Sequence, residues 1–357
     1  MNITFLISLI PVALFLMITP YLTRRTESFG VSIPADAYKH EDLVKMRKQY
    51  AWTILLCTLV AVAIILFFNS NGAVVFLMTL IAYVIVSFLI YLVFHHRMKK
   101  YKASQDWYNM RKQTLVVDTN FRSKPVTFSI GWFAIPFLIA VVTLLLSLIF
   151  YDKIPGKIPT HFGIDGQPDH WSIKSYRTVL MFPILQIMMI LLFAFINSMI
   201  GWSKSVIEAQ SPNESSQKNQ MFRRRWSGFT IFMGTLIVIM MGLDQFTFFL
   251  SVKPVVLSLI NFVPLGIILI TLIILAVTTG QGGSRIKLKG EQNAAVINRD
   301  DDRHWKLGVF YVNREDPSLF VEKRFGIGWT PNLAHPVSYL SLFGIIILVI
   351  LASVFLT

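Results

Sequence analysis

The chain has 357 residues, of which 54% are hydrophobic and only 15% are charged, and its mean hydropathy is +0.60. This balance excludes an ordinary soluble globular protein, and the apolar runs are far longer than the roughly 10 residues of a membrane β-strand, which excludes a barrel. The formal net charge of +14 could indicate a nucleic-acid-binding protein, so the positions of the basic residues have to be examined.

Eight apolar runs are long enough to cross a hydrocarbon core of roughly 30 Å as helices. They span residues 3–21, 51–68, 74–94, 132–151, 179–202, 228–248, 255–277 and 337–356. Backbone polar groups find no water inside a bilayer, so helices are the economical way to satisfy them. We therefore expect an all-α polytopic membrane protein with about eight transmembrane helices.

Basic residues are concentrated in alternate loops. Of the 33 Lys and Arg residues, 28 lie in the segments 22–50, 95–131, 203–227 and 278–336. The positive-inside rule predicts that these four segments are cytoplasmic and that both termini are extracytoplasmic. This distribution explains the excess charge by topology and by attraction to anionic lipid, so we expect the lipid bilayer as a partner and no nucleic acid.

The N-terminal region, residues 1–131, is predicted to be a three-helix membrane region with basic cytoplasmic loops. Its first loop should be extended through Phe29 and Gly30 and should then form a short polar helix capped near Asp36. Leu43 and Met46 suit a helix that lies at the membrane surface, but a solvated connector ordered by its neighbours is the favoured interpretation.

The region 132–202 is predicted to be a helix, an outward loop and a second helix. The loop contains the stretch "KIPTHFGIDGQPDHWSIKS", in which Gly163 and Gly166 bracket a sharp turn. Such a rigid, turn-rich loop can pack back over the helices with Phe162 and Trp171 as anchors.

Four loop side chains, His161, Asp165, Asp169 and His170, could in principle converge on a zinc ion. Adjacent residues cannot easily both be ligands, and no catalytic base is evident, so turn and capping roles are the favoured interpretation. A metal-dependent membrane enzyme that uses His161, Asp165 and His170 remains an open alternative, and the sequence leaves the metal unknown.

Polar residues inside the predicted spans are few: Asp244, Gln186, Asn197 and Asn261. Asp244 is the only acidic residue within a predicted span, which makes it a candidate for ion, proton or substrate binding. It lies about a turn below the outer surface, where water or a residue such as Lys253 could satisfy it. Interhelical hydrogen bonds explain the three amides. Residues 203–277 therefore contribute two further membrane helices.

Residues 278–336 form the one predicted soluble module, which precedes the last helix in 337–357. Two β-rich runs, "GVFYV" and "SLFVEKRF", flank the turn residues Asn313 to Pro317 and predict a small cytoplasmic β-hairpin. A two-stranded hairpin is marginal by itself, so it should pack on the helix ends. The acidic run Asp300 to Asp302 is expected to be solvated.

The outward loop also carries a recognisable pattern: Ile-Pro-x-His-Phe, Gly-x-x-Gly, Pro-Asp-x-Trp and Lys. It resembles a domain of unknown function, widespread in bacterial membrane proteins, that also forms the N-terminal part of the Sdp-type immunity proteins. Those proteins protect a producing bacterium from its own extracellular peptide toxin. The resemblance covers about 70 residues, 132 to 202. The matching positions are Ile158, Pro159, His161, Phe162, Gly163, Gly166, Pro168, Asp169, Trp171 and Lys174.

This resemblance implies a bacterial plasma-membrane protein and an extracytoplasmic peptide as a partner. The residues expected to meet that partner are His161, Phe162, Gly163, Asp165, Gly166, Asp169, His170, Trp171 and Lys174. The cytoplasmic stretch is similar to a second small uncharacterised module, which implies a cytoplasmic regulator. Its candidate residues are Trp305, Tyr311, Asn313, Asp316, Lys323, Arg324 and Trp329.

The predicted function is a non-enzymatic role in envelope defence or membrane signalling, without a cofactor. A small-solute or ion transporter is the first alternative, with Asp244, Asn261 and Gln186 along its path. The metal-dependent enzyme at the outward loop is the second.

Overall fold

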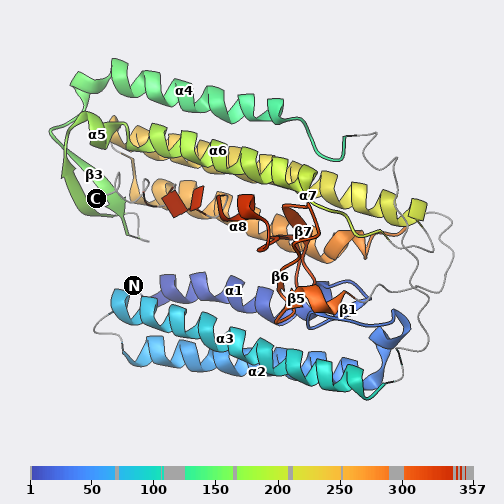
Figure 1. The fold of residues 1–357 in the computed structure, drawn as a ribbon. Helices are drawn as coiled ribbons and strands as arrows, with labels where there is room; N and C mark the ends of the chain where they lie inside the picture. The colour runs from blue at the N-terminus through green and yellow to red at the C-terminus, as the bar shows by residue number, and fades with distance from the viewer. Residues whose placement is uncertain are drawn as a thin grey trace. The chain divides into compact units, whose positions relative to one another are not determined.

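The computed structural model describes residues 2–68, 72–105, 107, 125–163, 167–207, 212–250, 252–288, 301–340, 343–344, 346–347 and 350. Its contacts divide the chain into two compact units (Figure 1). Unit 1 contains residues 1–124, 203–222 and 275–335, and unit 2 contains residues 125–202, 223–274 and 336–357. Each unit is therefore assembled from segments that are distant in the sequence.

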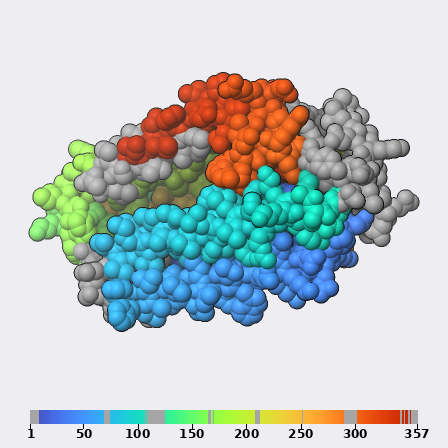
Figure 2. Space-filling view, turned by 60° about the horizontal axis from the view of Figure 1, so that its bottom comes forward, coloured from blue at the N-terminus to red at the C-terminus, as the bar shows by residue number. Residues whose placement is uncertain are grey.

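Unit 1 contains three neighbouring helices: α1 (Asn2–Leu22), α2 (Glu41–Phe67) and α3 (Gly72–Ala103) (Figure 1). Figure 2 shows α2 in blue and α3 in cyan lying along each other at the surface. Between α1 and α2, the strands β1 (Glu27–Ser28) and β2 (Val31–Ser32) pair antiparallel. The link between α1 and α2 is thus a small hairpin.

The turn of this hairpin is a packing centre of unit 1. Phe29, with φ 47°, is 1% exposed, and its ring lies 5.5 Å from Tyr50 and 5.4 Å from Phe94, measured between ring centroids. Gly30 follows with φ 76°, and an added Cβ there would lie 2.5 Å from the Gly308 carbonyl oxygen. The backbone at Gly308 therefore approaches the turn too closely for any side chain at position 30.

The predicted surface helix is only partly confirmed. A short 3-10 helix does occupy Asp36–Lys39, but Leu43 and Met46 belong to α2, which continues into the second apolar span. Both side chains are buried in the core of unit 1 and do not lie on a membrane surface. The apolar side chains of this stretch pack against other residues of the protein.

The module of residues 301–335 contains two hairpins with a pairing that differs from the predicted one. β5 (Trp305–Lys306) pairs with β6 (Phe310–Tyr311), and β7 (Phe320–Glu322) pairs with β8 (Trp329–Pro331). The two β-rich runs therefore pair with other segments and not with each other. Leu307 and Gly308, with φ 52° and 71°, make the tight turn of the first hairpin. Figure 2 shows residues of the module, in orange, against the C-terminal part of α3.

Unit 2 contains four long helical segments (Figure 1). They come from α4 (Ala134–Ile149), α6 (Met181–Trp202), α7 (Pro212–Gln245) and α8 (Pro254–Thr279). A 3-10 turn at Ile130–Phe133 precedes α4, and another occupies Tyr151–Lys153 after it. The short α5 (Tyr176–Val179) precedes α6. Between α4 and α5, β3 (Lys157–Phe162) and β4 (Pro168–Ile173) form an antiparallel hairpin.

Six helices among the described residues are long and apolar enough to cross a membrane. They are Glu41–Phe67, Val74–Ala103, Ile130–Ile149, Met181–Trp202, Pro212–Phe248 and Pro254–Gly283. In their most apolar windows at most 33% of the residues are buried within the protein, so most of that apolar surface needs lipid. The chain is a multi-pass membrane protein. The first predicted span is represented by a shorter apolar helix, Leu9–Leu22, and most of the last lies outside the described residues.

Two helices are longer than the apolar runs that predicted them. α3 continues to Ala103, through basic residues that were expected in a loop, and α7 begins at Pro212, within the expected polar connector. Hydropathy identifies only the apolar part of a helix, whereas these polar turns pack against protein. Asn219 and Phe222 of α7 are both 0% exposed.

Candidate functional site

The segment between α4 and α5, which the sequence predicted to be a rigid, turn-rich loop, is a two-stranded hairpin. Ile158 pairs with Ser172 and Pro159 with Trp171, and an irregularity follows before His161 pairs with His170. At the tip, the Gly163 amide donates a hydrogen bond to the Gln167 carbonyl oxygen over 2.8 Å. The all-α expectation therefore missed a sheet that holds most of the candidate residues.

The base of this hairpin is fixed to the helices of unit 2. Ile158 is 0% exposed and packs with Ile154, Val179 and Phe248. The Lys174 ammonium donates to the Ile154 carbonyl oxygen over 3.0 Å and lies 4.6 Å from the centre of the Tyr151 ring. Lys174 is thus an anchoring residue, a position that sequence reasoning assigned to recognition.

The C-terminal half of β4 carries exposed apolar side chains. Trp171 is 53% exposed, Ile173 is 75% exposed, and Tyr176 just beyond the strand is 61% exposed. Residues two apart on a strand share a face, so Trp171 and Ile173 form a stripe. The prediction that Trp171 anchors the loop is wrong, because Ile158 fills that role. Phe162 is half-buried.

The two loop histidines are opposite each other. His161 and His170 are register partners on β3 and β4, and both are exposed. The described residues include no group of three His, Cys, Asp or Glu side chains that could hold a metal ion. Asp165 and Gly166 lie outside the described residues, as does the side chain of Asp169. The histidine pair is therefore the only part of the candidate zinc set that the described structure places.

The buried amides join helices of unit 2, as expected. Gln186 on α6 donates to the Val238 carbonyl oxygen of α7 over 2.8 Å. Asn197 donates to the Phe128 carbonyl oxygen over 3.1 Å and accepts from the Ser227 hydroxyl over 2.5 Å. Each of these groups has a partner inside the protein, which accounts for its presence in an apolar helix.

Asp244 is bound by a neighbouring helix. The Asn261 side chain on α8 donates to the Asp244 carboxylate over 3.0 Å and also to the Leu257 carbonyl oxygen over 3.1 Å. Lys253 was the partner suggested by the sequence, and the structure gives Asn261 instead. Asp244 and Asn261, two residues of the expected transport path, are therefore in direct contact.

Asp316 is the centre of one group of contacts in the module of residues 301–335. Its carboxylate accepts from the Lys204 ammonium over 2.7 Å, the Tyr311 hydroxyl over 2.8 Å and the Ser318 amide over 3.0 Å. Burial by itself would raise the pKa of Asp316, but these donors outweigh it and lower the pKa to about 2. Asn313 donates to the same Tyr311 hydroxyl over 3.2 Å.

Arg324 is the centre of a buried ion cluster in unit 1. Its side chain is 4% exposed, pairs with Asp301 and Asp302, and lies 5.1 Å from the centre of the Trp305 ring. Asp302 also accepts from Lys102 of α3 over 2.6 Å. The acidic run was expected to be solvated, and for these two aspartates that prediction is wrong. Asp300 lies outside the described residues.

A second ion pair adjoins this cluster. Arg24, at the end of α1, pairs with the buried Glu322, which also accepts from Asn219 of α7 over 2.7 Å. Glu27 is 8% exposed nearby, and burial raises its pKa despite the opposing effect of Arg24 and Arg324. Sequence reasoning missed Asn219 and Glu322, because these partners are 103 positions apart and no local pattern marks them.

The remaining module residues have separate positions. Lys323 is exposed, in contrast to its neighbours. The Trp329 ring lies 5.4 Å from that of Phe222 on α7. Next to it, the Gln281 side chain donates to the Gly328 carbonyl oxygen over 2.9 Å and accepts from the Gly328 amide over 2.8 Å. The module therefore contacts α7 near its N-terminus and the turn that follows α8.

Comparison with known proteins gave two matches. Residues 138–187 match a domain of unknown function (DUF1648), which covers most of α4, the β3–β4 hairpin and the start of α6. Residues 314–339 match a family of unknown function (DUF5808), which covers β7 and β8. No curated protein and no solved structure matches the chain. These matches fit a membrane protein built from uncharacterised domains.

Replacing Arg324 by Gln should lower the free energy of unfolding by roughly 3–5 kcal/mol, because Asp301 and Asp302 would lose their buried cation. Thermal unfolding of the purified chain in detergent measures this change. Arg314→Gln, at an exposed position of the same module, is the matched control and should have little effect. Equal melting temperatures for Arg324→Gln and the unaltered protein would contradict the ion cluster.

Asp316→Asn should lower stability by about 1–2 kcal/mol at pH 7, allowing for solvent around the partly exposed Lys204. The folded-state pKa lies below the ordinary value of about 3.9, so ionised Asp316 stabilises the fold above that pH. The difference between the variant and the unaltered protein should shrink as the pH falls from 4 toward 2. Unfolding measured at pH 7 and pH 3, with the exposed Glu315→Gln as control, checks this, and a constant difference would refute it.

Proposed function

We propose that this chain is a non-enzymatic binding protein of the bacterial plasma membrane that acts in envelope defence, with the β3–β4 hairpin as its receptor for an extracytoplasmic peptide. The observation that carries the proposal is the contrast within the hairpin. Its base is fixed by Ile158 and Lys174, while Trp171 and Ile173 present an exposed apolar stripe. A held hairpin with an exposed apolar face can bind a partner at low conformational cost.

The sheet also suits an extended peptide. It has two strands among the described residues, so each has an outer edge that can accept a further strand. β3 carries Pro159 at its third position, which removes a hydrogen-bond donor, whereas β4 carries proline only at its first residue, Pro168. The peptide would therefore add along β4, with its apolar side chains against Trp171 and Ile173.

The resemblance to Sdp-type immunity proteins also supports a peptide ligand, because those proteins protect against an extracellular peptide toxin. The match of residues 138–187 to a domain of unknown function includes the hairpin. In this proposal the cytoplasmic module, residues 301–335, stabilises the bound state or contacts a regulator. Its exposed Lys323 is the candidate residue that remains accessible for such a contact.

Replacing both Trp171 and Ile173 by Ala should increase the sensitivity of cells to membrane-active peptides to the level of cells without the protein. The side chains are exposed, so folding should be retained, and amounts of protein in the membrane are checked by immunoblot. Trp132→Ala is the matched control, because Trp132 is 51% exposed and lies at the other end of α4. Unchanged peptide sensitivity in the double variant, or in cells without the protein, would rule out the proposal.

Transport is the second candidate function, favoured by the contact between Asp244 of α7 and Asn261 of α8. If Asp244 carries an ion or proton, Asp244→Asn should abolish pH-dependent uptake in proteoliposomes, while Asn261→Asp should retain part of it. Proton flux measured with a pH-sensitive dye inside the vesicles reports both. Flux that is the same with Asp244→Asn as without it would end this alternative.

A further inference from the structure

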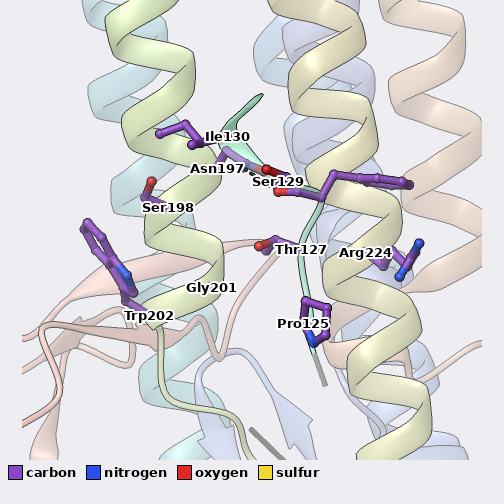
Figure 3. A pocket seen from close by; sticks show the side chains of 10 residues that line it. Pro125, Thr127, Ser129, Ile130, Asn197, Ser198, Gly201, Trp202 and Arg224 are labelled. Atoms are coloured by element: carbon purple, nitrogen blue, oxygen red, sulfur yellow. Dashed lines mark hydrogen bonds between the residues drawn. The ribbon is translucent and has the colours of Figure 1, made fainter. Parts of the chain in front are cut away.

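A cavity of about 460 Å³ lies in unit 2. It is bordered by the segment before α4, by the last turns of α6, and by Arg224 in the N-terminal half of α7. Figure 3 shows Trp202 and Ser198 on one side of it, Thr127 in the middle and Arg224 on the other side. We propose that this cavity binds the phosphate headgroup of an anionic phospholipid, with Arg224 as the cation that recognises it.

The cavity lies at the boundary of the apolar spans. It is at the start of the span Ile130–Ile149 and at the end of Met181–Trp202. Trp132 and Trp202 are 51% and 60% exposed at these two ends, as expected of tryptophans at the level of lipid headgroups. The distribution of Lys and Arg predicts that this end is cytoplasmic, the side on which anionic lipid attracts basic residues.

Three consecutive arginines at the cavity have different surroundings. Arg223 is 0% exposed and donates to the Ile200 carbonyl oxygen over 2.7 Å, so it caps the last turn of α6. Arg224 lines the cavity, is exposed, and lies 4.7 Å from the centre of the Phe128 ring. Arg225 is exposed and does not line the cavity. Stacking on Phe128 orients the Arg224 guanidinium while its N–H groups remain able to bind an anion.

The lining is complementary to a phosphate ester. None of the described residues that line the cavity is acidic, so Arg224 gives it a net positive charge. Thr127, Ser129 and Ser198 add hydroxyl groups. The Ser129 oxygen accepts from the Gly131 amide over 3.2 Å, which leaves its hydroxyl hydrogen to donate to an oxyanion.

The walls of the cavity are held in place by protein contacts. The Phe128 amide donates to the Ser227 hydroxyl over 2.9 Å, and the Phe128 carbonyl accepts from Asn197 over 3.1 Å. Ser227 in turn donates to Asn197, which closes a network between α6, α7 and the segment before α4. A cavity whose walls are hydrogen-bonded before a ligand arrives binds with a smaller entropic cost.

The apolar part of the lining favours a lipid over a free anion. Ile130 and the exposed Trp202 ring lie on the α6 side of the cavity, where they can contact the glycerol and the first methylene groups of a lipid. A soluble phosphate compound would gain nothing from these side chains.

The test uses the purified full-length chain in an uncharged detergent with phosphatidylglycerol, phosphatidylcholine or inorganic phosphate. Native mass spectrometry counts the bound lipids, and thermal unfolding measures the stabilisation that they give. We expect phosphatidylglycerol to bind and to raise the melting temperature more than phosphatidylcholine. Arg224→Gln should weaken its binding about tenfold or more, whereas the matched Arg225→Gln should change it by less than about twofold.

Arg224→Lys is the second variant, which keeps the charge and removes the planar guanidinium, and it should bind phosphatidylglycerol with intermediate strength. Equal losses in Arg224→Gln and Arg225→Gln would show diffuse attraction to anionic lipid and would overturn the proposal. Equal binding of both lipids would also overturn it. Stabilisation by inorganic phosphate alone, to the same extent as by phosphatidylglycerol, would replace a lipid site by a simple anion site.

Discussion

A buried charge requires a partner, and in unit 1 this requirement connects segments from the whole length of the chain. Arg324 pairs with Asp301 and Asp302, and Asp302 accepts a hydrogen bond from Lys102 near the end of α3. Arg24 pairs with Glu322 beside them. Removal of one member would leave an uncompensated charge at a cost of several kcal/mol, so these segments are stable only together.

In unit 2, some polar side chains stabilise the fold through hydrogen bonds, and other side chains remain exposed. Gln186 and Asn197 are used by helix contacts, and Lys174 holds the base of the hairpin. In contrast, Trp171 and Arg224 are exposed, one on the hairpin and one at the cavity. The two proposals rest on these accessible side chains, one for a peptide and one for a lipid.

The sequence predicted those parts of the fold that depend on local composition. The length of the apolar runs was enough to identify six of the helices, because a membrane span is defined by its own residues. The β-rich runs correctly indicated short strands, but the predicted hairpin around Asn313 and Asp316 was wrong, because β5 pairs with β6 through a turn at Leu307 and Gly308, and β7 pairs with β8. Composition indicates strands and turns, but it does not determine which strands pair.

The candidate site was predictable to a similar degree. The loop with His161 and Trp171 was found by its unusual composition, but its strands were not, because Pro159 and the two glycines favoured an irregular loop. Asp302 and Arg223 were interpreted as a solvated acid and a topology signal. Each is explained by one distant partner, Arg324 and Ile200 respectively, which no local pattern reveals.

The central claim is that the hairpin faces outward while the Arg324 module faces the cytoplasm. The single cysteine, Cys57, can be replaced by Ser, after which Trp171→Cys and Arg314→Cys introduce one thiol at each exposed position. A membrane-impermeant maleimide applied to intact cells should label position 171 and should label position 314 only after permeabilisation. Labelling of position 314 in intact cells, with position 171 protected, would contradict the account.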